Sequence, residues 1–188
     1  MHDLAPLTAL GATEARIDVI HGLTIREIPN IALASISTRL GKEAAFKRAV
    51  KATTAIALPA PGTSASASGM TIFWMAQDQW MVEASHDRHE NLAATLATAI
   101  KANGSVTEQN DGWARIDLEG NHCCAVLERL SAADSLAMTK GAATRTAIEH
   151  LGCFLLCRKA AKHYSVLCPR SAAASLHHAI ITAAQSAL

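Results

Sequence analysis

The sequence predicts an α+β fold built from two similar halves, each an antiparallel or mixed sheet with helices on one face. The order strand, strand, helix, strand, strand, helix is expected twice along the 188 residues. Bulky residues that open equivalent strands recur at a nearly constant offset. Ile31 and Trp113 lie 82 residues apart, and Trp80 and Tyr164 lie 84 apart. Such recurrence indicates an internal repeat.

The repeat divides the chain into an N-terminal extension and two halves. Residues 1–21 are expected to form the extension, 22–104 the first half and 105–188 the second, together making one compact domain. Within the first half, residues 59–69 (PAPGTSASASG) are low in sequence complexity and predict a flexible loop. Because each half alone buries little apolar surface, we expect the two sheets to share a core.

The first half begins with two apolar, strand-like segments. Residues 21–30 and 31–38 are expected to pair as a hairpin, because Pro29-Asn30 between them is a turn signal. Residues 39–53 then carry apolar side chains at helical spacing, with basic side chains on the remaining faces. Such a basic face could bind an anion, although a solvated surface is the commoner role. The basic residues are Lys42, Lys47, Arg48 and Lys51.

The segment 73–84, FWMAQDQWMVEA, holds two of the three tryptophans of the chain. It predicts a hairpin with Asp78 at its corner, and antiparallel pairing would bring Trp74 and Trp80 about 5 Å apart. We expect both rings to be mostly buried packing residues that contact no cofactor, with Asp78 at the exposed tip. A helix over 87–104 completes the first half.

The second half is expected to repeat this order. Residues 105–120 predict a hairpin that turns at Asn110-Asp111-Gly112, a strong turn signal. Residues 122–131 predict a helix with one apolar stripe, and Asn121 can cap its start. The remaining elements are strands within 144–159 and 163–169 and a closing helix over 170–188.

The composition excludes several classes of function. A formal net charge of +1 gives no electrostatic attraction to nucleic acid or to an anionic membrane. No apolar run approaches the roughly 20 residues needed to cross a bilayer. The start of the chain lacks the basic residues and the long apolar stretch of a signal peptide. We therefore expect a soluble cytoplasmic protein that binds neither nucleic acid nor a membrane.

Motifs that carry chemistry are absent from the sequence. It contains no glycine-rich loop for dinucleotides or phosphates, no nucleophile elbow and no zincin motif. The five cysteines form no CxxC pair, and in a chain without export signals we expect reduced, buried thiols rather than zinc ligands. The residues alone therefore predict no catalytic, cofactor-binding or metal-binding group in this chain.

Several segments carry a family resemblance. The tryptophan hairpin described above resembles the hairpin of folate-binding aminomethyltransferase domains. Residues 141–180 are more similar to the gamma subunit of heterotetrameric sarcosine oxidase, and the first strands resemble the first hairpin of that subunit. The likeness covers most of the chain from about Gly22 onward. The matching residues are Thr144-Arg145-Thr146, His150, Arg158, Tyr164, Pro169-Arg170-Ser171 and Ser175-Leu176.

The resemblance implies a folate-binding aminomethyltransferase-like fold and the role of a non-catalytic gamma subunit. This subunit would accompany alpha, beta and delta subunits and dock chiefly on the folate-binding region of alpha. The complex would convert sarcosine, oxygen and tetrahydrofolate to glycine, hydrogen peroxide and methylene-tetrahydrofolate. FAD, FMN, NAD, zinc and tetrahydrofolate are then expected in the partner subunits, and no cofactor in this chain. The alternative is a stand-alone folate-binding or aminomethyltransferase-like protein.

One departure from the family bears on catalysis. The active-site carboxylate of the related aminomethyltransferases falls at Ser68-Gly69 here, and residues 59–77 contain no Asp or Glu. We therefore expect an oxidoreductase subunit without an active site of its own. Within it, Arg145, Arg158 and Arg170 could form ion pairs with a partner or tether loops internally. We favour the internal role.

Overall fold

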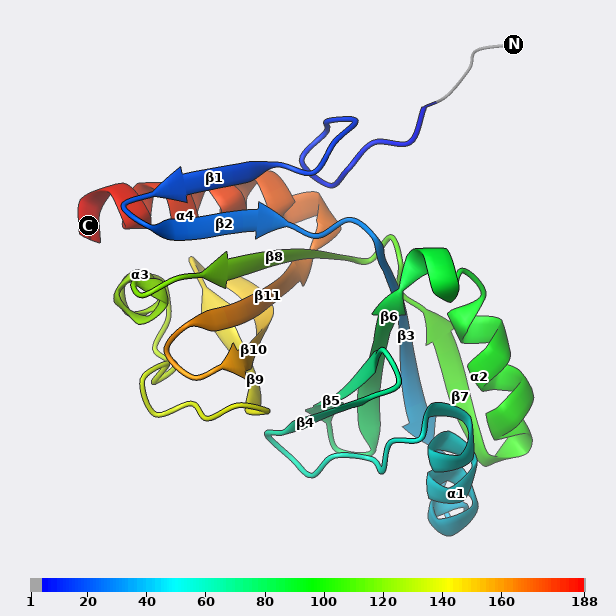
Figure 1. The fold of residues 1–188 in the computed structure, drawn as a ribbon. Coiled ribbons are helices and arrows are strands. Elements are labelled where there is room, and N and C mark those ends of the chain that lie inside the picture. Colours follow the sequence, from blue (N-terminus) through cyan, green and yellow to red (C-terminus); the bar gives the residue numbers. More distant parts are fainter. Residues whose placement is uncertain (1–4, 188) are drawn as a thin grey trace. The chain divides into compact units, whose positions relative to one another are not determined.

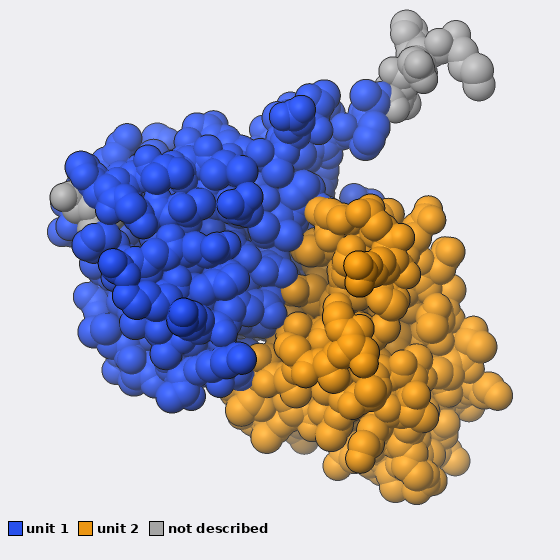
Figure 2. Space-filling view, viewed as in Figure 1, with its two compact units in different colours: residues 1–29, 111–188 blue, residues 30–110 orange. Residues whose placement is uncertain are grey.

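The computed structural model describes residues 5–187, which form two compact units (Figure 1). The central unit is Asn30–Asn110, and the terminal unit combines Met1–Pro29 with Asp111–Leu188 (Figure 2). Within the described range, each unit contains one antiparallel sheet and two α-helices, which confirms the α+β prediction. No helix in that range is long and apolar enough to span a bilayer.

The central unit contains five strands. They are β3 (Ile31–Thr38), β4 (Ser64–Ala67), β5 (Met70–Ala76), β6 (Gln79–Ser85) and β7 (Gly104–Glu108), in the sheet order β4-β5-β6-β3-β7. Helices α1 (Glu43–Thr54) and α2 (Leu92–Ile100) cover one face of this sheet (Figure 1). Phe46 and Leu96 are fully buried there, in one apolar cluster with Ile36.

The terminal unit contains six strands. They are β1 (Ile17–Ile20), β2 (Leu23–Glu27), β8 (Trp113–Glu119), β9 (Ala143–Ile148), β10 (Leu151–Lys159) and β11 (His163–Pro169), in the order β1-β2-β8-β11-β10-β9. Helices α3 (Cys123–Leu130) and α4 (Ala173–Ala187) pack on one face. Alternate strand residues such as Ile116 and Val166 form the core beneath them.

The two sheets share one strand order, which confirms the predicted repeat. The series β7-β3-β6-β5-β4 corresponds to β2-β8-β11-β10-β9. Register agrees at the level of single residues. Trp80 pairs with Ile36, and Tyr164 pairs with Leu118. The two partners, Ile36 and Leu118, lie 82 residues apart, which is the offset between Ile31 and Trp113.

The two compact units do not coincide with the predicted halves, which meet between residues 104 and 105. β2 precedes β3 along the chain but pairs with β8, whereas β7 precedes β8 but pairs with β3. Each repeat therefore contributes its first strand to the other sheet, and the hairpins expected over 21–38 and 105–120 do not form. Pro29 explains the first error. It lacks an N–H and favours extended backbone in the residue before it, so the chain continues onward from β2.

Two segments that were expected to be irregular contain strands. Ser64–Ala67, within the predicted loop 59–69, pairs with β5 as an edge strand. Ile17–Ile20, within the predicted extension 1–21, pairs with β2. Residues 1–4 of that extension lie outside the described residues. A short run of Ser and Ala has low strand propensity, so pairing to a neighbour decides the structure of β4.

The helix boundaries also correct the sequence prediction. The helix expected over 87–104 consists of α2 between the 3-10 turns η1 (His86–Arg88) and η2 (Lys101–Asn103). Asn121 does not cap α3, because His122 precedes the first helical residue and makes no side-chain cap bond. The Asn121 side chain instead accepts a hydrogen bond from Lys162.

Candidate functional site

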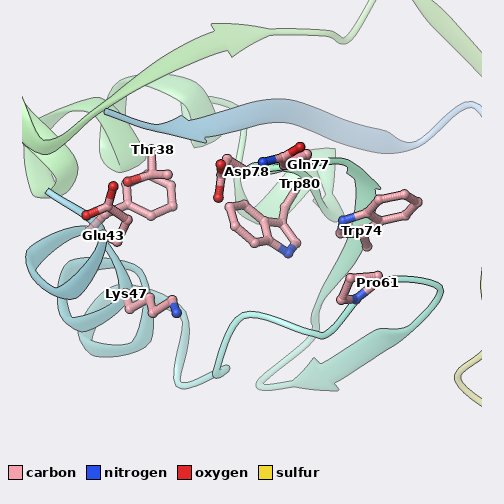
Figure 3. A pocket seen from close by; sticks show the side chains of 9 residues that line it. Thr38, Glu43, Lys47, Pro61, Trp74, Gln77, Asp78 and Trp80 are labelled. Carbon is pink, nitrogen blue, oxygen red and sulfur yellow. The ribbon is translucent and has the colours of Figure 1, made fainter. Parts of the chain in front are cut away.

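The central unit contains a pocket of about 420 Å³ beside the first turns of α1 (Figure 3). Helix α1 supplies one wall, the β5–β6 hairpin supplies another, and the loop before β4 supplies a third. The lining residues are Thr38, Glu43, Phe46, Lys47, Pro61, Trp74, Gln77, Asp78 and Trp80. The pocket thus brings both tryptophans of the predicted hairpin together with one lysine of the predicted basic helix.

Trp80 and Trp74 make different contributions to this pocket. Trp80 is only 8% exposed, and its Nε1–H donates a hydrogen bond to the Pro59 carbonyl at 2.9 Å. The centroid of the Phe46 ring lies 6.0 Å from that of the Trp80 ring. Trp74 lies directly opposite Trp80 on β5 and is half-buried. The expected burial therefore holds for Trp80, whereas Trp74 keeps part of its ring uncovered.

The loop that closes the pocket is held by hydrogen bonds at both ends. Trp80 binds the Pro59 carbonyl at one end, and the backbone N–H of Trp74 donates to the Thr63 carbonyl at 3.0 Å at the other. Between them, the Thr63 backbone N–H and hydroxyl both donate to the Ala60 carbonyl. These bonds fix the loop so that Pro61 stays beside Trp74 (Figure 3).

Some polar side chains of the pocket make hydrogen bonds within the protein, and others make none. The Glu43 carboxylate accepts the Gly41 N–H at 2.8 Å, and hydrogen bonds from backbone N–H groups, aided by nearby Lys47, hold the pKa of Glu43 below its usual value. Glu43 therefore stabilises the start of α1. Within residues 5–187, the side chains of Lys47, Gln77 and Asp78 have no hydrogen-bond or ion-pair partner.

The corner of the hairpin holds Asp78 in an unusual backbone conformation. Its φ angle is +57°, in the left-handed region that Asp adopts more readily than most residues. The Thr38 N–H donates to the Asp78 carbonyl at 3.2 Å, which ties the corner to the end of β3. Asp78 is exposed, as expected for the tip, and its side chain borders the pocket.

The three arginines singled out from the sequence lie in the terminal unit, and each contacts a group of that same unit. The internal role and a role toward a partner both stay predictions for these arginines. The contacts are Arg145 with the Phe154 ring (5.8 Å to its centroid), Arg158 Nε with Ser165 Oγ (2.8 Å) and Arg170 Nη2 with the Leu7 carbonyl (3.0 Å).

The terminal unit also contains a charged cluster that sequence reasoning missed. Asp117 accepts two hydrogen bonds from Arg115, at 2.7 and 2.5 Å, and lies 3.0 Å from His163 Nε2. Burial alone would raise the pKa of Asp117, but the hydrogen bonds from His163 and Arg115 outweigh it and hold that pKa well below its usual range. Glu119 lies two residues after Asp117 on β8, so both side chains are on the same face. Asp117, Glu119 and His163 are therefore three possible metal ligands. Because Arg115 already neutralises Asp117, the cluster fits an ion-pair network better than a cation site.

The five cysteines are buried and unpaired, as expected. Burial raises the pKa of Cys123 and Cys168 to about 12 and that of Cys153 to about 11. Because the thiolate is the form that attacks electrophiles and binds metals, thiols with such pKa values are poorly reactive at neutral pH.

The architecture of two α+β repeats with their first strands exchanged is consistent with the aminomethyltransferase-like fold that the sequence resemblance predicts. The structure is similar to a chain of the heterotetrameric sarcosine oxidase from Corynebacterium sp. U-96, determined in complex with pyrrole 2-carboxylate. The TM-score is 0.78 at 22% sequence identity, and the match covers 90% of this chain and 87% of that chain.

The fold also matches the glycine cleavage system aminomethyltransferase T from Bartonella henselae. The TM-score is 0.60 at 14% identity, covering 82% of this chain but 44% of that enzyme, so this chain spans less than half of its length. No protein-family model and no curated protein matches the sequence. At these identities the two structures confirm, at the level of the fold, the resemblance noted in the sequence.

Proposed function

We propose that this chain is a non-catalytic subunit of a heterotetrameric sarcosine oxidase, equivalent to its gamma subunit, and that it supports the folate-binding region of the alpha subunit. One observation carries the proposal: the likeness to a sarcosine oxidase chain extends over nearly the whole of both chains, which therefore have similar lengths. More than half of the aminomethyltransferase, by contrast, has no counterpart here.

The chemistry of the chain supports an accessory role. Residues 59–77 contain no Asp or Glu where the related aminomethyltransferases carry their active-site carboxylate. The Asp117 carboxylate is engaged by Arg115, and the buried thiols have raised pKa values. None of these groups offers an activated base or nucleophile for an N-methyl amine.

In the proposed complex, the reaction belongs to the partner subunits. Alpha, beta and delta would hold FAD, FMN, NAD, zinc and tetrahydrofolate, and would oxidise sarcosine with release of hydrogen peroxide and transfer of the one-carbon unit to tetrahydrofolate. This chain would contribute a protein-binding surface to that cytoplasmic assembly. A stable contact of this kind buries on the order of 1,000 Å² or more.

Co-expression with the other three subunits tests the proposal. An affinity-tagged copy of this chain should recover alpha, beta and delta in fixed stoichiometry. Sarcosine-dependent formation of hydrogen peroxide should require the assembly and be absent from this chain alone. Recovery of an intact and equally active complex that lacks this chain would contradict the accessory role.

The stand-alone folate-binding alternative is favoured by one feature, the aromatic pocket of the central unit. Calorimetric titration of the isolated chain with tetrahydrofolate separates the two functions. Micromolar affinity would favour the alternative, and an absence of binding heat across several temperatures would favour the accessory role.

A further inference from the structure

We propose that the pocket of the central unit binds a small planar aromatic molecule that carries an acidic group and an N–H donor. The inference rests on geometry inside one compact unit and does not depend on the proposed function. The volume of about 420 Å³ lies within the range, about 300–1,000 Å³, that small-molecule sites occupy.

The walls of the pocket determine the shape of the ligand. The Trp80 ring is fixed by its hydrogen bond to Pro59 and by packing against Phe46. Trp74 and Pro61 lie on another side of the same space (Figure 3). Aromatic rings pair favourably by offset stacking or edge-to-face contact, with centroids about 4.5–7 Å apart. A flat aromatic ring is therefore the ligand that can contact both tryptophans.

The polar side chains that make no hydrogen bond within the described residues indicate which polar groups the ligand carries. Lys47 extends its ammonium group from α1 toward the pocket, opposite the hairpin corner (Figure 3). This ammonium group lies near enough to Glu43 to lower the pKa of that carboxyl, but it makes no salt bridge or hydrogen bond among the described residues, so it can bind an acidic group of the ligand. The Asp78 carboxylate, also without a partner in the described range, can accept an N–H, and the Gln77 amide can donate or accept. Glu43 also lines the pocket and stays ionised, with its carboxylate bound to the Gly41 N–H at the start of α1.

The pocket is already formed without a ligand, which lowers the cost of ordering its walls on binding. The loop carrying Pro61 is held at both ends, and the corner carrying Asp78 is tied to Thr38. The tight left-handed turn at Asp78 keeps its side chain at the rim.

Nuclear magnetic resonance of the full chain, with its tryptophans labelled with nitrogen-15, tests the proposal. The chain has three indole N–H groups, and Trp113, in the terminal unit, serves as the internal reference. Indole-3-acetate is the probe, because it combines a planar ring, an acidic group and an N–H. We expect it to shift the signals of Trp74 and Trp80 saturably and to leave that of Trp113 in place. Indole, tryptamine and 1-methylindole-3-acetate, which each lack or invert one feature, should bind more weakly.

Two lysine variants provide the matched pair. Lys47→Gln should weaken the binding of indole-3-acetate about five-fold, the effect expected of an exposed ion pair, and leave the binding of indole unchanged. Lys51→Gln, one helical turn further along α1 and outside the pocket lining, should leave both unchanged.

Three results would overturn the proposal. The first is that the Trp74 and Trp80 signals stay unmoved by about 5 mM of every probe, a concentration beyond the range of specific binding. The second is equal loss of affinity in the Lys47→Gln and Lys51→Gln variants. The third is binding of tryptamine as tight as that of indole-3-acetate. All three results are binding measurements on the isolated chain. Failure of the complex to assemble would therefore count against the proposed function without affecting this test.

Discussion

Trp74 of β5 lies directly opposite Trp80 of β6, and the register of the two strands shifts between Trp74 and Ala76. Such a bulge bends the strand and increases its twist. Both rings line the pocket and pack in the apolar cluster beneath α1, but Trp80 is nearly buried whereas Trp74 is only half-buried. Neighbouring rings in one hairpin therefore have different roles, which substitution can separate.

Replacing Trp80 by Phe should destabilise the fold more than replacing Trp74 by Phe. Trp80→Phe removes the buried Nε1–H donor and leaves the Pro59 carbonyl without it, which costs about 1–3 kcal/mol. Trp74→Phe removes no described hydrogen bond from a half-buried side chain and should cost less than about 1 kcal/mol. Urea unfolding of both variants gives the comparison, and equal losses would contradict the distinct roles.

Two glycines in strands provide a second matched pair. A Cβ on Gly104 would lie 2.4 Å from the Ser37 carbonyl and 2.6 Å from the Phe46 ring, whereas a Cβ on Gly152 would meet nothing within 4 Å. Gly104→Ala should therefore cost about 2 kcal/mol or more by overpacking. Gly152→Ala should be neutral or stabilise by about 0.5 kcal/mol, because it reduces the freedom of the unfolded chain. Thermal melting distinguishes them, and similar shifts would show that the β7–α1 contact is loose.

The sequence predicts those parts of the fold that depend on residues close together in the chain or on internal repetition. The hairpin around Asp78 and the offset between Trp80 and Tyr164 follow from alternation and from repetition, which are local signals. The exchange of β2 and β7 does not, because β2 pairs with β8 and β7 pairs with β3, and each of these partners lies far away in the sequence. Pro29-Asn30 is compatible both with a hairpin turn and with a chain that continues into another sheet, so this dipeptide does not identify the partner of β2.

The candidate pocket was predictable only in its parts. The sequence shows basic residues on one helix and two tryptophans in one hairpin, and the basic face of that helix could bind an anion. The sequence does not show which lysine lines the same pocket as Asp78, because the position of Lys47 depends on how Phe46 packs α1 against the hairpin. Side-chain direction on a helix becomes known only when its buried face is fixed.

The cysteines should be inert in the folded chain. All five are buried, and the raised pKa values of Cys123, Cys153 and Cys168 keep them protonated at neutral pH. A thiol-specific disulfide reagent at pH 7 should therefore label them only at the rate of local or global unfolding. In denaturant, all five should react rapidly. Fast labelling of any thiol in the native chain would show that its side chain opens to solvent.

Arg170→Ala tests whether the Arg170 side chain stabilises this chain internally or binds a partner subunit. Its guanidinium donates to the Leu7 carbonyl, so loss of the side chain should free the N-terminal segment at a cost below about 1 kcal/mol, because the bond is exposed. Co-purification with the other subunits should persist if the role is internal. Unchanged melting together with lost complex would instead assign Arg170 to the interface.

The pH dependence of stability should be dominated by Asp117 in the acid range. Hydrogen bonds from His163 and Arg115 lower its pKa in the folded state against the effect of burial, whereas the unfolded value is about 3.9. A lowered folded pKa contributes stability that is fully present above about pH 5 and is lost as the pH falls through the unfolded value toward the folded one.

Asp117→Asn should therefore lower the free energy of unfolding at pH 7 by about 3 kcal/mol, since it removes the buried carboxylate that pairs with the mostly buried Arg115 guanidinium. It should also flatten the decline in that free energy between about pH 5 and pH 3. Asp18→Asn is the comparison. Hydrogen bonds, chiefly from the exposed Arg16 and also from His177, lower the pKa of Asp18, but salt and solvent screen the Arg16–Asp18 pair, so the change with pH should be smaller. Urea titrations across this pH range give the slopes. Parallel curves for the native chain and Asp117→Asn would place the acid-sensitive group elsewhere.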